Sequence, residues 1–172
     1  MRVRRPYFFY NDRVKIRPAV PADAEAFLDI YAPIVRDTAI SFELEPPTAD
    51  ELRARMAKAH LWIAAEDDGM LGYAYAAPFR DRAAYRFSVE TTVYVHERAR
   101  RRGVGRGLYA ELFRQLAERR FVTALAVITL PNRSSVALHE SMGFKPVGVF
   151  HNVGFKFETW HDTGWWEREV NA

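Results

Sequence analysis

Residues 89–117 constrain the fold more than any other part of the 172-residue chain. Residues 89–95 alternate β-branched and aromatic side chains, which is typical of a strand. Three glycines follow between positions 103 and 107. Apolar residues then recur at helical spacing from about Val104, on a face made by Leu108, Leu112, Phe113, Leu116 and Ala117. The segment therefore predicts a strand, a glycine turn and a helix in direct succession.

The glycine turn has the chemistry of an anion-binding site. A turn that opens a helix presents unpaired backbone N–H groups at the positive end of the helix dipole, and phosphate is the obvious anion. Five arginines in nine positions add guanidinium donors. No Lys-Ser or Lys-Thr follows the glycines, which excludes a P-loop, and Leu108 replaces the third glycine of a dinucleotide fingerprint. The residues instead form the pattern Arg100-x-x-Gly103-x-Gly105, which we interpret as a phosphate-binding turn. The alternative interpretation is a basic, solvated turn that binds no ligand.

Length and composition favour one domain, which we expect over residues 14–172 after an extension formed by residues 1–13. Hydrophobic residues make up 49% and charged residues 27% of the chain, as in ordinary globular proteins. The absence of cysteine excludes disulfides and thiolate catalysis. No apolar run is long enough to span a bilayer or to form a signal-peptide core, so we expect a cytoplasmic protein.

Strands and helices alternate along the chain, which predicts an α/β (α+β) fold with a mixed sheet. Pro33 is expected to kink or shorten the first helix, and Thr48-x-x-Glu51 reads as a capping box. The strand at 122–130 has the continuous apolar character of a fully buried strand. A turn is expected at Thr163-Gly164. The expected strands are 14–17, 61–65, 70–76, 89–95, 122–130, 144–150 and 155–169; the expected helices begin after Pro21, at 48, near 104 and at 134.

Two side chains are candidates for acid–base chemistry. Alternation along the strand puts Glu90, Thr92 and Tyr94 on one face, and a partly desolvated carboxylate there would be a better base. A salt bridge from Glu90 to Arg82 or Arg86 is the alternative. His139 lies on the short helix after Asn132; a lone histidine is more often a surface or hydrogen-bonded core group. The histidines show no metal-ligand spacing, so we expect no metal site.

Beyond these patterns, the chain resembles the GNAT superfamily of N-acetyltransferases and, within it, the phosphinothricin N-acetyltransferase family. The resemblance runs from about residue 15 to 169. The matching pieces are Ile16-Arg-Pro-Ala-x-x-x-Asp23, Phe42-x-x-Glu-Pro46, Val89-Glu-x-Thr-Val-Tyr-Val95, Leu130-Pro-Asn132, Leu138-His-Glu-x-x-Gly-Phe144, Gly154-Phe-Lys156 and Trp160-His-Asp-x-Gly164.

The resemblance implies a GNAT fold and acetyl transfer from acetyl-CoA to a primary amine, with Glu90 as the general base and His139 as a second acid/base group. The Val93 amide would polarise the thioester carbonyl. The other expected acetyl-CoA contacts come from the end of the strand, the glycine turn and the following loop: Val93, Tyr94, Val95, Arg100, Arg101, Arg102, Gly103, Val104, Gly105, Arg106, Gly107, Asn132 and Ser135.

For the amine, the family points to a small amino-acid analogue of the phosphinothricin or methionine sulfoximine type, held by Phe42, Arg80, Arg82 and Tyr85. Arginines and a tyrosine suit a carboxylate and a second polar group. Solvated loop charges are the alternative for the two arginines. The resemblance and the aromatic carboxyl-terminal strands also imply a homodimer. Other amine acceptors, and a basic nucleic-acid-binding module, are the competing functions.

Overall fold

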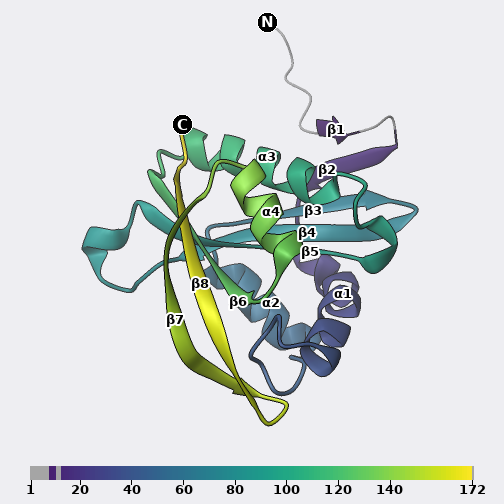
Figure 1. Ribbon diagram of the computed structural model, residues 1–172. Coiled ribbons are helices and arrows are strands. Elements are labelled where there is room, and N and C mark those ends of the chain that lie inside the picture. The colour runs from purple at the N-terminus through teal and green to yellow at the C-terminus, as the bar shows by residue number, and fades with distance from the viewer. Residues whose placement is uncertain (1–7, 11–12, 172) are drawn as a thin grey trace, which may run out of the picture.

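The computed structural model describes the backbone of residues 8–10 and the whole of residues 13–171. Over this part of the chain, eight strands form one sheet in the order β1-β2-β3-β4-β5-β6-β8-β7. All neighbouring strands are antiparallel except β5 and β6, which run parallel, so the expected mixed sheet is confirmed (Figure 1). The strands are β1 Phe8–Tyr10, β2 Val14–Pro18, β3 Leu61–Asp67, β4 Gly69–Pro78, β5 Ser88–Val95, β6 Thr123–Leu130, β7 Lys145–Lys156 and β8 Thr159–Glu169.

Helices cover both faces of the sheet. On one face, α3 contributes Leu108 and Leu112 to the larger apolar core, which also contains Ile63 of β3. On the other face, α1 and α2 enclose a second core that contains Phe27 and Tyr73. The α-helices are α1 Ala24–Asp37, α2 Ala49–Lys58, α3 Val104–Glu118 and α4 Arg133–Ser141, and the short 3-10 turns are η1 Pro21–Asp23, η2 Ala83–Tyr85 and η3 Glu97–Ala99.

The capping box predicted at the start of α2 is present. The Thr48 hydroxyl accepts a hydrogen bond from the Glu51 amide at 3.2 Å, and the Glu51 carboxylate accepts one from the Thr48 amide at 2.7 Å. Two of the otherwise unpaired N–H groups at this helix end are therefore satisfied by side chains.

Pro33 does not shorten α1, which continues to Asp37. The proline removes one intrahelical donor, but the last turn still closes through a hydrogen bond from the Thr38 amide to the Ile34 carbonyl at 3.2 Å. Ile34 and Val35 are buried in the second core. Burial of these two side chains holds the final turn in place, so the expectation of a shorter helix was wrong.

Two expectations for the carboxyl-terminal half also need correction. β6 is not fully buried, because Val127 remains 37% exposed on the face away from the core. Thr163 and Gly164 form no turn; both are paired within β8, opposite Thr129 and Ile128 of β6. The turn of the β7–β8 hairpin instead lies at Phe157 and Glu158, both with positive φ. A Thr-Gly pair predicts a turn only where its backbone is not hydrogen-bonded to neighbouring strands.

The expected amino-terminal extension adds to the sheet. Residues Phe8–Tyr10 form β1, which pairs antiparallel with β2. Residues 1–7 and 11–12 of this extension, and the carboxyl-terminal residue 172, lie outside the described residues. Three residues of the expected extension thus pair with the sheet, and the domain boundary at residue 14 stays a prediction.

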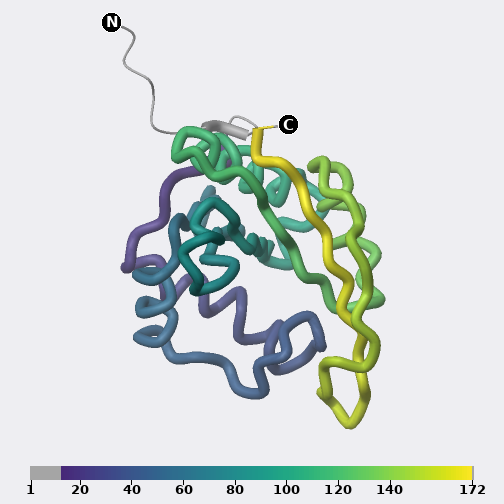
Figure 2. The backbone as a smooth tube through the Cα atoms, turned by 90° about the vertical axis from the view of Figure 1, so that its left-hand side faces the viewer, coloured from purple at the N-terminus to yellow at the C-terminus, as the bar shows by residue number. Residues whose placement is uncertain are grey.

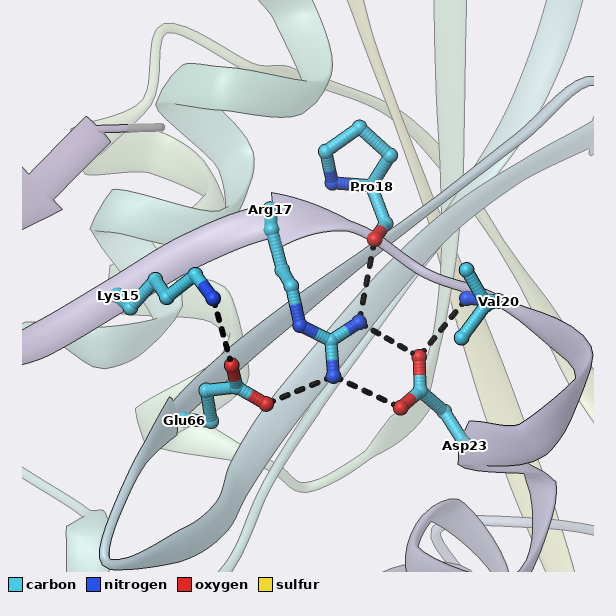
Figure 3. A network of polar contacts seen from close by, with 6 residues as sticks. All are labelled: Lys15, Arg17, Pro18, Val20, Asp23 and Glu66. Carbon is cyan, nitrogen blue, oxygen red and sulfur yellow. Dashed lines mark hydrogen bonds and ion pairs between the residues drawn. The ribbon is translucent and has the colours of Figure 1, made fainter. Parts of the chain in front are cut away.

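A partly buried ionic network joins β2, η1 and β3 (Figure 3). The Arg17 guanidinium donates to both oxygens of Asp23 at 2.8 Å and to Glu66 at 2.7 Å. Asp23 also accepts from the Val20 amide at 2.8 Å. Burial alone would raise the pKa of Asp23, but the hydrogen bonds from Arg17 and Val20 outweigh it and lower that pKa. Arg17 and Asp23, two residues of the first matching sequence piece, thus have a structural role.

Candidate active site

The sheet opens where β5 and β6 separate. The two parallel strands pair only over Ser88, Val89 and Glu90 of β5. Beyond Glu90, β5 stays paired with β4 as far as Val95, but within the described residues no strand pairs with its other edge. This leaves backbone groups of residues 91–95 available to a ligand, and the predicted contact residues Val93, Tyr94 and Val95 lie in that stretch.

The predicted glycine turn lies directly beyond the end of β5 and opens α3. Gly103 is the N-cap, with a φ of 80° that favours glycine, and α3 begins at Val104. A Cβ placed on Gly105 would lie 3.6 Å from the Val95 side chain, which is van der Waals distance. The turn therefore packs against the open end of β5. Gly107, one turn into α3, is buried. The open edge of β5 and the positive end of α3 therefore adjoin each other.

The arginines around this turn differ in their surroundings. Arg98 donates to the backbone carbonyls of Asp68 and Met70, which ties η3 to the β3–β4 hairpin. The predicted phosphate contacts point to solvent instead, and among the described residues they form no ion pair. Those exposed residues are Arg100, Arg101, Arg102 and Arg106.

Glu90 lies at the point where the strands separate. The alternative of a salt bridge is not seen, because within the described residues neither Arg82 nor Arg86 pairs with it. Burial raises the pKa of Glu90, and the positive charge of Arg80 only partly offsets that effect. A half-buried carboxylate that none of the described groups hydrogen-bonds can accept a proton from a ligand in the opening.

A cavity of about 270 Å³ lies on the same face of the sheet as Glu90. Ala77, which is paired with Glu90 across β4 and β5, is part of its lining. The cavity is walled mainly by aromatic side chains, with Arg55 and Lys58 of α2 as its charged members. Sequence reasoning missed it, although alternating tyrosines in β4 were the available signal. The aromatic lining consists of Tyr31, Trp62, Tyr73, Tyr75 and Tyr94.

His139 lies on the other face of the sheet and is only 4% exposed. Its Nε2 lies 2.8 Å from the Tyr109 hydroxyl, and its Nδ1 lies 2.7 Å from the Ser135 carbonyl. The carbonyl can only accept, so Nδ1 carries the proton and Nε2 accepts from Tyr109. Burial lowers the pKa of His139. Burial thus disfavours the charged form of this histidine, which lies between α3 and α4.

The loop after β6 supplies the two remaining predicted contacts. Asn132 is the N-cap of α4, and its side-chain oxygen accepts from the Ser135 amide at 3.1 Å and from the Ser134 hydroxyl at 3.1 Å. The Ser135 hydroxyl lies 3.4 Å from Nδ1 of His139. Both residues therefore shape the start of α4.

The structure separates the four predicted substrate residues into two groups. Arg80, Arg82 and Tyr85 are exposed on the segment that connects β4 to β5, and the charge of Arg80 acts on Glu90. Phe42 lies on the segment between α1 and α2, where its ring packs against His161 with 6.0 Å between ring centroids. Arg80 is thus brought to Glu90, whereas Phe42 packs against the β7–β8 hairpin.

The fold and the opening beside α3 agree with the comparisons with known proteins. The acetyltransferase (GNAT) domain family matches residues 16–165, and the chain belongs to this family. It is therefore an N-acetyltransferase by class. In the part of the chain that the structure describes, no helix has the length and apolarity to cross a membrane.

Within this family, the chain is similar to several phosphinothricin N-acetyltransferases. A phosphinothricin N-acetyltransferase of Streptomyces viridochromogenes is 39% identical, over 91% of this chain and 87% of the relative. One from Streptomyces coelicolor is 40% identical, over 91% of this chain and 96% of the relative. A solved phosphinothricin acetyltransferase from Sinorhizobium meliloti, in complex with AcCoA, superimposes with a TM-score of 0.87 at 34% identity, covering 91% of this chain and 88% of that one.

Proposed function

We propose that this enzyme transfers the acetyl group of acetyl-CoA to the primary amine of a small amino-acid-like substrate of the phosphinothricin or methionine sulfoximine type. The observation that carries the proposal is Glu90: a half-buried carboxylate with a raised pKa at the point where β5 and β6 separate. The relatives named above, two of them about 40% identical, support the choice of amine.

Glu90 is the general base in this proposal. An amine with a pKa near that of lysine, about 10, is mostly protonated at neutral pH and has no lone pair to attack a thioester. Glu90 accepts the ammonium proton, directly or through one water, and the neutral nitrogen then forms the amide bond as the carbon–sulfur bond breaks. A raised pKa makes Glu90 a stronger base than an exposed glutamate.

The chain's own groups fit acetyl-CoA along the opening. The unpaired edge of β5 around Val93, Tyr94 and Val95 suits the amides of an extended pantetheine arm, and the Val93 amide would polarise the thioester carbonyl. The amides from Gly103 to Arg106 offer backbone donors to the diphosphate, whereas the Gly107 amide donates to the Gly103 carbonyl at 3.0 Å. Arg100, Arg101, Arg102 and Arg106 add charge, and Asn132 and Ser135 border the arm from α4.

The acid/base role implied for His139 stays a prediction. Its hydrogen bonds to Tyr109 and Ser135 favour instead a role in holding α4 against α3. The two roles separate in His139→Phe. A proton-transfer role predicts a changed pH profile for kcat, whereas a packing role predicts an unchanged profile with a lower melting temperature.

For the amine substrate, we propose that Arg80 and Arg82 bind the carboxylate and the second polar group. Tyr85 packs against Phe79 with 5.6 Å between the two ring centroids, and the Arg80 guanidinium lies over the same Phe79 ring. Phe42 contacts the carbon skeleton from the other side. Two arginines also disfavour strongly cationic acceptors such as polyamines, because like charges repel.

The test is a kinetic screen that follows CoA thiol release. Phosphinothricin, methionine sulfoximine and methionine sulfone form one set of amines; spermidine and a peptide with a free amino terminus form the other. We expect turnover with the first set and little with the second. Turnover confined to the second set would contradict the amino-acid-like substrate. If a folded protein that binds CoA turned over neither set, both groups of amines would be excluded as substrates.

We also propose a homodimer built on β7. Large apolar side chains along this strand are exposed, including Val147, Phe150, Val153 and Phe155, each more than half exposed. An exposed apolar surface of this kind is typical of an interaction site. Light scattering should give twice the chain mass of 19.9 kDa, and Phe155→Asp should reduce it to one chain. A monomeric wild type would contradict this.

The single domain expected over residues 14–172 and the cytoplasmic location remain proposals. One cooperative unfolding transition, seen alike by fluorescence and circular dichroism, would support the first. Cell fractionation tests the second.

A further inference from the structure

The segment between α1 and α2 carries Phe42 and lies beside the tip of the β7–β8 hairpin in both views (Figures 1 and 2). Residues 38–47, which we call the acceptor segment, contain no helix or strand. The hairpin tip is the turn at Phe157 and Glu158. Without secondary structure of its own, the acceptor segment takes its position from the contacts that it makes with neighbouring elements.

Lys156, the last residue of β7, makes the first of these contacts. Its side chain is buried, at 4% exposure. The ammonium donates to the Val35 carbonyl of α1 at 2.6 Å and to the Ser41 carbonyl at 2.8 Å. Ser41 directly precedes Phe42. A buried ammonium loses much free energy if its acceptors move away, so these bonds fix the backbone beside Phe42.

Gly154 and His161 make further contacts, and both touch Phe42 itself. A Cβ at Gly154 would overlap the Phe42 ring, so only glycine leaves room for it. The His161 ring lies against Phe42, and its Nε2 lies 3.1 Å from the Lys156 carbonyl, close enough to donate a hydrogen bond. Lys156 therefore holds Ser41, and Gly154 and His161 contact Phe42.

The acceptor segment also reaches the aromatic cavity. The Ser41 hydroxyl lies 2.8 Å from the Tyr31 hydroxyl, which in turn donates to Glu43 at 2.8 Å. Tyr31 lines the cavity. A shift of the acceptor segment would therefore move both Phe42 and a wall of that cavity.

We propose that Gly154, Lys156 and His161 are positioning residues that set Phe42 at the amine end of the active site and so determine the affinity for the amine. This inference rests on the proposed function, in which Phe42 contacts the amine. It gives a role to two sequence pieces, Gly154–Lys156 and Trp160–Gly164, that the chemistry at Glu90 leaves unexplained.

The sharpest test compares two glycines of the same strand. Gly154→Ala places a methyl group where the Phe42 ring lies, whereas Gly148→Ala meets nothing within 4 Å. We expect Gly154→Ala to raise KM for the amine on the order of tenfold, because misplaced contacts weaken substrate positioning. KM for acetyl-CoA should stay within twofold, and Gly148→Ala should leave both constants unchanged. Equal effects of Gly154→Ala on both substrates would overturn the proposal.

A double-mutant cycle shows whether Phe42 carries the effect. In a Phe42→Ala background the overlapping ring is gone, so adding Gly154→Ala should raise KM for the amine no further. Full additivity of the two losses would mean that Gly154 acts by another route, and the proposal would fall.

Lys156 is tested by removal and chemical rescue. Lys156→Met keeps the apolar stem but loses the donors, and we expect the same selective rise in KM for the amine. Because the chain has no cysteine, Lys156→Cys can be alkylated in denaturant with 2-bromoethylamine and refolded, which restores an ammonium at the same reach. Recovery of KM for the amine in the alkylated protein supports the proposal, and a folded alkylated protein without recovery contradicts it.

The wild-type arm separates this inference from the proposed function. If the wild type turns over none of the amino-acid-like amines, the proposed function fails and this inference fails with it. If the wild type is active while Gly154→Ala and Lys156→Met leave its KM for the amine unchanged, only the positioning role is lost.

Discussion

Glu90 and Asp23 are both acidic residues at least partly removed from water, and their surroundings differ in one respect. Asp23 accepts hydrogen bonds from Arg17 and from the Val20 amide, whereas Glu90 has no hydrogen-bond partner among the described residues and is acted on by the charge of Arg80. The pKa of Asp23 is lowered and the pKa of Glu90 is raised. Burial raises the pKa of both carboxylates, and the hydrogen-bond partners decide whether the net shift is upward or downward.

This difference indicates which carboxylate serves stability and which serves chemistry. A carboxylate whose charge is stabilised by partners increases the free energy of unfolding and so stabilises the folded state. A carboxylate buried without partners costs free energy when ionised, and such a residue is a candidate for proton transfer where it lines an opening. Four experiments test this contrast.

The largest effect is expected for Glu90→Gln. Loss of the base should lower kcat/KM for the amine about 10²- to 10³-fold at neutral pH, since general-base catalysis contributes roughly 10²- to 10⁴-fold. Affinity for acetyl-CoA, measured by calorimetry, should be kept. Asp68→Asn, a change at an exposed carboxylate on the β3–β4 turn, is the matched control and should be neutral. Full activity in Glu90→Gln would remove the base role.

Asp23→Ala should have the opposite character, with a large effect on stability and little on kcat. It breaks the paired hydrogen bonds to Arg17, and hydrogen bonds to charged groups contribute about 1.5–3 kcal/mol, so we expect a loss of about 2–4 kcal/mol. Urea unfolding measures the change. Asp29→Ala, at an exposed position of α1, should change the unfolding free energy by less than about 0.5 kcal/mol. Similar losses in the two variants would refute the structural role.

The pH dependence of stability should separate the two residues by sign. The folded-state pKa of Asp23 is lowered, so its contribution is present above the unfolded-state pKa and is lost as pH falls through the folded-state pKa. The stability gap between wild type and Asp23→Ala should therefore narrow on acidification. The folded-state pKa of Glu90 is raised, so Glu90→Gln should be the more stable protein near pH 7, with that advantage shrinking at low pH.

The smallest effect on the Glu90 carboxylate itself is expected for Arg80→Gln, beside the rise in KM for the amine that follows from the proposed contact of Arg80 with the substrate. The charge of Arg80 holds down the pKa of Glu90, so its removal should raise that pKa and move the acidic limb of the kcat/KM profile to higher pH. Arg86→Gln removes a neighbouring charge that lies over the Phe87 ring, and should leave the limb in place. An unmoved limb in Arg80→Gln, with Glu90→Gln inactive, would mean that another group sets the limb.

Local sequence patterns were enough to predict much of the fold. The glycine turn before α3, the capping box at Thr48 and the alternation that sets Glu90 apart from Val89 follow from residues near one another in sequence, so the sequence alone was enough to predict them. The same holds for the family, whose motif pieces are short and contiguous.

Tertiary structure decided what depends on distant partners. Thr163 and Gly164 look like a turn until β6 and β7 pair with β8 on both sides, and Pro33 reads as a helix end until the burial of Ile34 and Val35 is counted. The residues around Phe42 lie more than 100 positions away in sequence. The desolvation of Glu90 and the burial of Lys156 are likewise set by packing, because burial depends on distance in space and not on spacing along the chain.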